Sequence, residues 1–336
     1  MDDSLQKYPI SKSLRTWLLQ ELWKECGAPG TAGSRDMSSY FDYYSARCQR
    51  FSHEGGIHIC VDSHGGIIDI ARQIVTDATK DEVCSALARQ TGNGGNRPNW
   101  TIDTTVELCG GLLVMAELGL QNTEGDPLSW HRDQTLRQAV ARHFQPEKQL
   151  QPDNPRLGKL FTARNLIYIG GMKIAWTSNI VDHLRLSEDT QTVFVFYHAE
   201  FLRYQNCFPT PLFPDSFIDE TLLTLALLFP QNDRKSRSWL SGQISEYSLD
   251  RGIERRFEKF SFWHDRLVIL HQAFDEADPR GLRQWWNDRR NSVQWYTFWV
   301  AILVFIITVF FGLVQSIEGA LQVYLSWQAL KQGGGS

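Results

Sequence analysis

The residues with the clearest potential for chemistry lie in and just beyond one uncharged segment, Asn291–Ile317. Small and polar residues recur there every three or four positions, so on a helix they fall within about 60° of a common direction. Lipid offers polar groups no hydrogen-bond partner, so such a face predicts either packing between helices or the lining of a water-filled pore. The face comprises Thr297, Ala301, Val304, Thr308, Gly312, Gln315, Glu318, Gly319 and Gln322.

Two polar members of this face would give a pore its chemistry. If several copies of the helix surround a wet axis, Gln315 and Glu318 form rings that attract and partly dehydrate cations. The simpler alternative is helix packing within a homo-oligomer, because small residues such as Gly312 let helix backbones approach closely. The two alternatives can coexist, since a ring of helices needs contacts between neighbours as well as a lumen.

The sequence contains no recognisable catalytic motif. A GxSxG elbow, a Walker A loop, a dinucleotide-binding fingerprint and an HExxH pair are all absent from the sequence. The pairs Asp182-His183 and His264-Asp265 fall in predicted helices, where neighbouring side chains diverge, so we expect surface or capping roles for them. We predict that the protein is not an enzyme and needs no cofactor, and the residue spacing assigns no metal ligands.

The small-and-polar face belongs to residues 291–328, which are predicted to form a transmembrane helix and its juxtamembrane end. Trp295–Val314 is almost wholly apolar, and twenty residues at about 1.5 Å rise cover the roughly 30 Å hydrocarbon core. Tryptophan and tyrosine flank it on both sides, as in the aromatic belts of membrane proteins. Four arginines between residues 280 and 290 precede it, so the positive-inside rule predicts a cytosolic N-terminal part.

Composition agrees with a cytosolic location for the part before the span. The N-terminal residues begin acidic and lack the apolar region of a secretory signal peptide. Six cysteines without CxxC pairs or regular spacing predict reduced, buried thiols. The formal net charge of −4 gives no general basic surface, so we expect the lipid bilayer, and not nucleic acid, as a partner.

A second helical pattern precedes the span. From Ile253 onward apolar residues are spaced by three or four positions, close to a heptad seam. The pattern predicts a long helix over residues 250–290, kinked near Pro279, that either self-associates as a stalk or packs on its own domain. The seam comprises Ile253, Phe257, Phe260, Trp263, Leu267, Leu270 and Phe274.

The remainder is expected to form a cytosolic α+β domain in two parts. Residues 1–145 are predicted to be mostly helical, and a polar, proline-bearing stretch separates them from residues 156–248. In the second part, Asn165–Trp176 and Gln191–His198 are rich in β-forming residues and predict a small mixed core. Gly333–Ser336 resembles an artificial linker.

Three shorter segments have more specific predictions. Ile57–Val61 and Gly66–Ile70 are expected to be two short strands, or a strand leading into a helix. Ser216 opens an apolar helix with capping-box character. Residues 231–248 are polar and are predicted to form a loop.

A resemblance to known proteins rests on the stretch FWHDRLVILHQAFDEADPRGLRQWWNDRRNSVQWYTFWVAILVFIITVFFGLVQSIEGALQVY. This stretch closely resembles uncharacterised filamentous-fungal membrane proteins with a cytosolic domain and the same ending, as do TSNIVDHLRL and TVFVFYHAEFL upstream. The fungal group is distantly similar to the CorA superfamily of divalent-cation channels. That similarity implies a pentamer that transports or is regulated by a divalent cation such as Mg²⁺. The Gly-Met-Asn ending of the CorA first span is unmatched, a second span is missing, and only Gly312 can be carried over.

We therefore expect a single-pass membrane protein in which a cytosolic α+β domain is followed by a long helix and one C-terminal transmembrane helix. One predicted function is a homo-oligomeric, divergent CorA-like cation channel or transporter. The alternative is a membrane-tethered interaction or signalling module without a pore. The stoichiometry of the protein would discriminate between these two functions.

Overall fold

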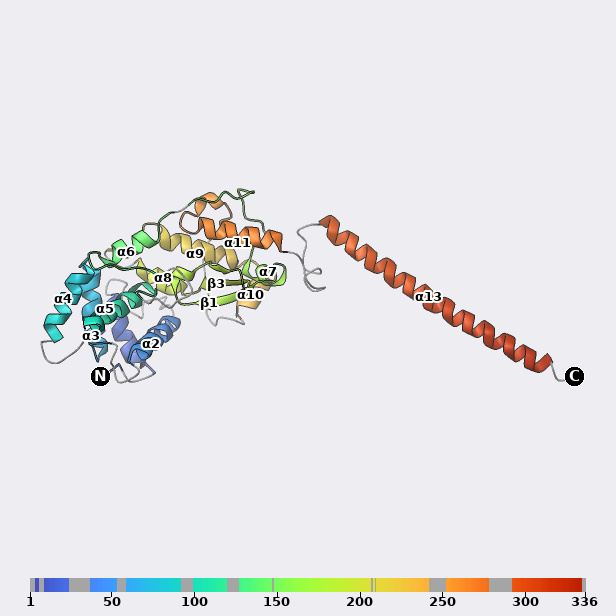
Figure 1. Ribbon diagram of the computed structural model, residues 1–336, viewed down its shortest axis with the longest axis horizontal. Helices are drawn as coiled ribbons and strands as arrows, with labels where there is room; N and C mark the ends of the chain where they lie inside the picture. The colour runs from blue at the N-terminus through green and yellow to red at the C-terminus, as the bar shows by residue number, and fades with distance from the viewer. Residues whose placement is uncertain are drawn as a thin grey trace. The chain divides into compact units, whose positions relative to one another are not determined.

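The computed structural model describes residues 4–5, 9–23, 37–52, 59–91, 99–119, 127–146, 148–206, 208, 210–241, 252–277 and 292–333. The chain divides into two units, Met1–Ala277 and Asp278–Ser336. The first, which we call the folded unit, combines many helices with a small sheet, and the second contains one long apolar helix (Figure 1). The sequence predicted an α+β domain followed by a C-terminal apolar helix, and the structure confirms this arrangement of elements.

The N-terminal half of the folded unit is helical. In α5, Gly110 leaves room for its neighbours, because a Cβ there would lie 2.8 Å from both Leu118 Cδ1 and Trp130 Cζ3. Helix α5 packs against α2, α3 and α4, so it forms the centre of this half (Figure 1). These helices span α1 (Lys12–Leu22), α2 (Ser38–Ser52), α3 (His64–Val75), α4 (Lys80–Thr91) and α5 (Asn99–Val114).

Helix α3 corrects one prediction made for this half. The predicted strand Gly66–Ile70 lies inside α3, so only the helical alternative for this segment was right. Ser63 caps the helix by accepting from Gly66 N at 3.1 Å. Its buried residues include Ile67, Ile70 and Ile74. This spacing of three and four outweighs the β propensity of isoleucine. Residues 59–61 form no strand in the part of the preceding segment that the structure describes.

A three-stranded sheet lies in the second half of the folded unit. Its order is β1-β3-β2, with β1 parallel to β3 and β2 antiparallel to β3. The predicted β-rich segment Asn165–Trp176 begins as helix, because Thr162 Oγ1 caps α7 by accepting from Asn165 N. The elements are α6 (Leu136–His143), α7 (Ala163–Tyr168), β1 (Lys173–Thr177), the 3-10 helix η2 (Ile180–Asp182), β2 (Leu186–Ser187) and β3 (Thr192–Phe196).

The remaining helices cover the sheet. Helix α9 is buried on nearly all sides, as expected of a central helix, and packs against α8, whereas α11 packs against β2. The capping box predicted at Ser216 is wrong: this residue has a left-handed φ of 66°, and its side chain makes no capping hydrogen bond. These elements are α8 (Ala199–Gln205), α9 (Phe217–Leu228), α10 (Arg234–Ser241), the 3-10 helix η3 (Phe257–Lys259) and α11 (His264–Glu276).

Helix α10 corrects the predicted loop over residues 231–248. Asp233 Oδ2 accepts from both the backbone N and the hydroxyl of Ser236, at 3.2 and 2.6 Å, and this arrangement starts a helix in a polar sequence. Residues 242–248 lie outside the described part of the chain.

The continuous helix predicted over residues 250–290 is wrong in its first part. Residues 252–255 are not helical, and α11 begins only at His264. The backbone is held by another segment, because Leu157 N donates to Arg255 O at 2.8 Å and Phe257 N donates to Pro155 O at 3.2 Å. The predicted kink at Pro279 lies outside the described residues.

A buried carboxylate gives the second reason for the late start of α11. Glu220 of α9 accepts from the backbone N of Ser261, Phe262 and Trp263 at 2.8, 2.7 and 2.8 Å. In a continuous helix these N–H groups would bond to carbonyls four residues earlier. The carboxylate therefore fixes a non-helical turn that the local sequence does not encode.

Candidate functional site

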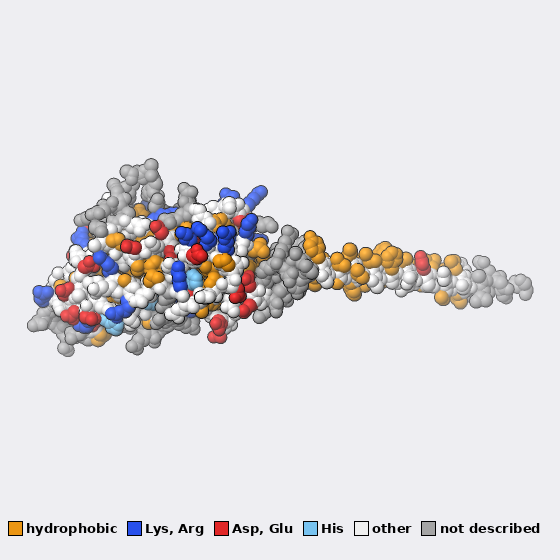
Figure 2. All heavy atoms as spheres, turned by 90° about the horizontal axis from the view of Figure 1, so that it is seen from above, with side chains coloured by type: hydrophobic (Ala, Val, Ile, Leu, Met, Phe, Trp, Pro, Cys, Tyr) orange, Lys and Arg blue, Asp and Glu red, His pale blue; other side chains and the backbone are white. Residues whose placement is uncertain are grey.

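The long helix of the second unit is a candidate membrane span. Helix α13 (Ser292–Gly333) contains an apolar stretch, Tyr296–Gln328, of 33 residues. At about 1.5 Å per residue this stretch is about 50 Å long, which exceeds the roughly 30 Å hydrocarbon core of a bilayer. Its hydrophobic side chains are exposed along its length (Figure 2), and Phe305, for example, is 68% exposed. Length and composition thus indicate membrane association for this part of the chain.

The predicted small-and-polar face lies on α13, and its residues are largely exposed. A Cβ at Gly312 or Gly319 would meet nothing within 4 Å, so the helix alone gives no reason for glycine at either position. Thr308 Oγ1 donates to Val304 O at 2.8 Å, so this hydroxyl is satisfied within the helix. The long polar side chains of Gln315, Glu318 and Gln322 are therefore the members of the face with the greatest need for water or a protein partner.

The predicted seam, in contrast, is buried inside the folded unit. Phe260, Leu267 and Leu270 are each 0% exposed. Trp263 Nε1 donates to Thr221 Oγ1 of α9 at 2.9 Å. Ile253 packs against the same core as a partly buried residue. Of the two alternatives that the sequence left open, packing on its own domain is the one that the structure shows, and the buried residues are unavailable for a self-associating stalk.

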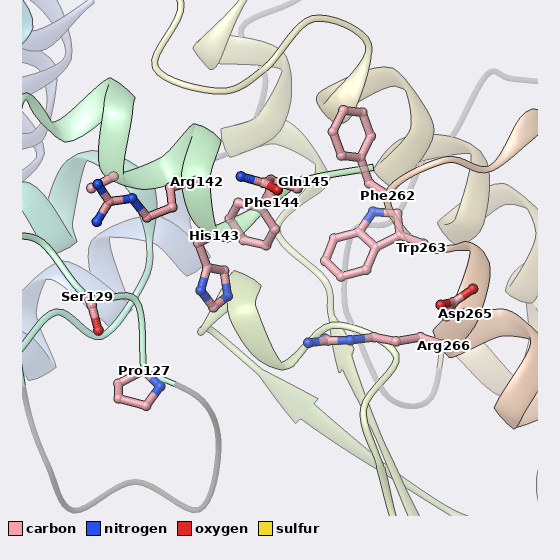
Figure 3. Close-up of a pocket in the computed structure, with 11 residues that line it drawn as sticks. Pro127, Ser129, Arg142, His143, Phe144, Gln145, Phe262, Trp263, Asp265 and Arg266 are labelled. Atoms are coloured by element: carbon pink, nitrogen blue, oxygen red, sulfur yellow. The ribbon is translucent and has the colours of Figure 1, made fainter. Parts of the chain in front are cut away.

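One pocket of about 420 Å³ lies between the end of α6 and the start of α11 (Figure 3). His143 and Arg266 extend toward each other across it, and Trp263 and Phe144 form an aromatic wall. The guanidinium of Arg266 is held by the protein, since Nη1 donates to Val181 O and His183 O at 2.6 and 2.7 Å. The pocket combines cationic and aromatic groups, which suits binding.

Two groups near this pocket are fixed in one charge state. Burial, together with the nearby charge of Arg266, lowers the pKa of His183 to about 3. His183 is thus neutral near pH 7. Its Nε2 lies 2.7 Å from Thr224 Oγ1, and its Nδ1 accepts from Phe196 N. Burial alone would raise the pKa of Asp265, but hydrogen bonds from His264 and from the backbone N of residues 149 and 150 hold it below its ordinary value.

These contacts correct the roles expected for the acid–imidazole pairs. His183 is a 0% exposed core residue and not a surface residue. Its neighbour Asp182 instead accepts from Asn179 and Arg185 at 3.0 and 2.8 Å. In the other pair the side chains do meet, with His264 Nδ1 2.9 Å from Asp265 Oδ1.

A second pocket, also of about 420 Å³, lies beside the carboxyl ends of the parallel strands β1 and β3. Ser178 follows β1 and lines this pocket, and Arg47 of α2 lines it from the N-terminal half. His198 follows β3, and its Nε2 lies 2.8 Å from Ser178 Oγ. The carboxyl ends of parallel strands are a common place for ligands in open α/β sheets.

This second pocket was not predicted from the sequence. Thr177-Ser178-Asn179 and His198 each follow an apolar strand, and that shared position was the available signal. It could be used only after β1 and β3 were known to be parallel neighbours, because this pairing brings the two strand ends together.

Metal ligation has no support in the residues that the structure describes, among which no group of three or more His, Cys, Asp or Glu side chains could hold an ion. The four described cysteines, Cys48, Cys60, Cys84 and Cys109, are buried and form no disulfide with one another, as predicted.

Comparisons with protein-family models, with curated proteins and with solved structures gave no match for this chain. The resemblance to fungal membrane proteins and to CorA-like channels therefore stays a prediction.

Proposed function

We propose that this protein is a membrane-tethered interaction or signalling module without a pore. Helix α13 anchors the chain in a bilayer, and the folded unit, Met1–Ala277, is on the cytosolic side and binds ligands or partners. The observation that carries this proposal is the burial of the seam: Leu267 and Leu270 are each 0% exposed within one chain. The part of the sequence that most favoured a self-associating stalk is thereby used for folding.

The pockets of the folded unit give the proposal its second support. Each measures about 420 Å³, within the range of about 300–1,000 Å³ that small-molecule sites occupy. Neither pocket requires a second copy of the chain, because the described residues that line each one all belong to the folded unit.

Membrane anchoring is tested with the full chain and a doubly charged variant. We expect the wild-type chain to stay with membranes during alkaline carbonate extraction. Ile306→Lys combined with Phe310→Lys should release it, since each lysine near the middle of a span costs roughly 3 kcal/mol. The control carries lysines at Leu150 and Leu160, two exposed apolar positions of the folded unit. Extraction of the wild-type chain by carbonate would refute the anchor.

Orientation has its own test. Protease added outside sealed vesicles prepared with the cytosolic face outward should digest the folded unit and spare the C-terminal end of α13. Cleavage at both ends of the chain would show that both termini face the cytosol, and the proposed orientation would then be wrong.

A second candidate function is a divergent CorA-like cation channel formed by several copies of α13. The observation that favours it is the small-and-polar face, on which Gly312 and Gly319 have open space in a single chain. Such a channel would conduct a divalent cation such as Mg²⁺ and would be a homo-oligomer, pentameric if it follows CorA.

Purified protein in liposomes decides between the two functions. Conduction predicts flux of Mg²⁺, K⁺ or Na⁺ that falls or changes selectivity in Glu318→Gln, because the acidic ring loses its charge. The tethered module predicts a monomer, or an oligomer without flux above that of empty liposomes.

A further inference from the structure

The pocket at the ends of β1 and β3 has an unusual concentration of guanidinium groups. Arg47 and Arg50 reach it from α2, and Arg185 reaches it from the turn before β2. Arginine presents its donors in a planar fork that matches phosphate and carboxylate oxygens. We call this site the arginine pocket.

The acidic residues of the arginine pocket do not neutralise it. Glu117 Oε1 lies 3.1 Å from Arg47 Nη1 and 3.7 Å from Arg50 Nη1, so one carboxylate serves two guanidinium groups. Asp182 Oδ1 pairs with Arg185 Nε at 2.8 Å. Three guanidinium groups facing two carboxylates leave one net positive charge in the pocket.

Two residues that line the pocket each carry a buried polar atom without a protein partner. Among the described residues, Arg47 Nε and Glu117 Oε2 are buried and make no hydrogen bond. Arg47 as a whole is only 6% exposed, so leaving one of its donors unpaired costs free energy in the structure without a ligand. The unpaired nitrogen requires an acceptor and the unpaired carboxylate oxygen requires a donor.

A serine hydroxyl adds a further donor to the pocket. Ser178 Oγ lies 2.8 Å from His198 Nε2, and His198 Nδ1 lies 3.2 Å from Ser39 Oγ. Burial lowers the pKa of His198 to about 3, so the ring is neutral near pH 7, with one donor and one acceptor nitrogen. When Ser39 donates to Nδ1, Nε2–H donates to Ser178, and the Ser178 hydroxyl hydrogen can then point to a ligand.

We propose that the arginine pocket binds a hydroxyl-bearing phosphate monoester. The phosphate oxygens accept from the guanidinium groups and from Ser178, and a ligand hydroxyl donates to Glu117. A tetrahedral phosphate can accept from several directions at once, which suits arginines that come from two separate elements, α2 and the turn before β2. A volume of about 420 Å³ also holds more than a bare phosphate ion.

The first test measures affinity by isothermal titration calorimetry on the full chain in phosphatidylcholine nanodiscs. The probes are ribose 5-phosphate and inorganic phosphate. We expect ribose 5-phosphate to bind, and both Arg185→Ala and Ser178→Ala to weaken it, Arg185→Ala by about tenfold because a charge-assisted hydrogen bond is lost. Arg132→Ala is the matched control, because this arginine pairs with Asp81 and Asp103 away from the pocket. Its affinity should equal that of the wild type.

Glu117→Gln provides a readout that a general loss of folding cannot mimic. This variant frees guanidinium groups from a competing carboxylate, so it should bind inorganic phosphate at least as tightly as the wild type does. It should lose the preference for ribose 5-phosphate over inorganic phosphate. The neutral side chain that replaces Glu117 is a weaker acceptor for the ligand hydroxyl than a carboxylate. Thermal unfolding of each variant confirms that the folded unit is intact.

The source of the phosphate is distinguished by adding lipid. Phosphatidic acid carries a phosphate monoester. If the natural ligand is a lipid headgroup, nanodiscs that contain phosphatidic acid should weaken the binding of ribose 5-phosphate. The effect should exceed that of discs of equal charge made with phosphatidylserine. Equal effects of both lipids indicate a soluble ligand. The proposal is overturned if the wild-type chain binds neither probe at millimolar concentration and phosphatidic acid has no specific effect. Affinities that are unchanged in all pocket variants would overturn it as well.

Discussion

The seam at Ile253–Phe274 and the small-and-polar face at Thr297–Gln322 show the same helical spacing in the sequence and have different surroundings in the structure. The first is buried in the core of the folded unit, whereas the second is exposed on a lone helix. A periodic pattern therefore identifies residues that share a face, but it does not identify what that face contacts.

The number of charged residues explains why the seam is buried and the small-and-polar face is exposed. Between the apolar positions of the seam lie Glu254, Arg255, Arg256, Glu258 and Lys259, so this segment has a polar side that water can cover. The apolar stretch of α13 offers the single charge of Glu318 among its described side chains. An amphipathic segment can close a soluble core, whereas an uncharged one of this length needs lipid or other helices.

The largest expected effect is on folding, and it separates burial from self-association. Leu267→Asp should destabilise the folded unit by about 4 kcal/mol or more, because it places a carboxylate in an apolar core. Ile269→Asp is the matched control on the same helix, since Ile269 is 43% exposed, and we expect it to cost less than about 1 kcal/mol. Urea unfolding followed by circular dichroism measures both. If Leu267→Asp kept the stability of the wild type and changed only the oligomeric state, the seam would act as a self-associating stalk.

The next effect tests the carboxylate that shapes the start of α11. Glu220→Ala should cost about 3 kcal/mol, because it leaves buried N–H groups of residues 261–263 without an acceptor. Glu220→Gln keeps one acceptor oxygen and should cost less. Asp219→Ala, at an exposed neighbouring position on α9, is the control. If α11 still began at His264 in Glu220→Ala and stability were unchanged, the carboxylate would not be the cause of the late helix start.

A further effect concerns acid, which should act on the stability of the folded unit. Burial lowers the pKa values of His183 and His198 to about 3, from ordinary values near 6.5. Between these values the unfolded chain binds more protons than the folded chain, so stability falls as the pH falls from 6.5 toward 3. Each histidine contributes a slope of up to about 1.4 kcal/mol per pH unit.

His198→Gln isolates one histidine in this pH dependence. Glu220 has a pKa that burial raises, although three backbone hydrogen bonds oppose the shift, and it therefore acts in the opposite direction. Comparison of the wild-type chain with His198→Gln cancels that contribution. Urea unfolding between pH 4 and 6.5 should show a slope reduced by up to one proton in the variant. Identical slopes would mean that His198 does not titrate differently in the two states.

The sequence predicted those parts of the molecule that local pattern decides. The uncharged run at Asn291–Ile317 identified α13, and the apolar run after Ser216 identified α9. The four cysteines among the described residues are buried as expected. In each case the number and type of neighbouring residues sufficed, because burial or membrane insertion outweighs finer preferences.

The parts that failed depend on residues far apart in the chain. Glu220 interrupts the predicted seam helix from a distance of about forty residues, and the backbone around Pro155 pairs with residues 255–257. Ser178 and His198 meet only because β1 and β3 are parallel neighbours. Local spacing carries no information about such contacts. Neither the break in the seam helix before His264 nor the arginine pocket could therefore be derived from it.

The smallest expected effect on folding belongs to the small-and-polar face, and it tests what that face contacts. Gly312→Leu should leave the unfolding temperature of the folded unit unchanged, because a side chain at this position meets nothing within 4 Å in one chain. If the face packs against other copies, the same change should dissociate or rearrange the oligomer, since glycine permits close approach of helix backbones. Ala320→Leu adds similar bulk about 80° from Gly312 around the helix and about 140° from the centre of the small-and-polar face, and it is the matched control. Native mass spectrometry in detergent reads the stoichiometry of all three proteins. A monomeric wild type would assign the face to lipid or to another partner, and an oligomer that tolerates leucine at both positions would place the contact elsewhere.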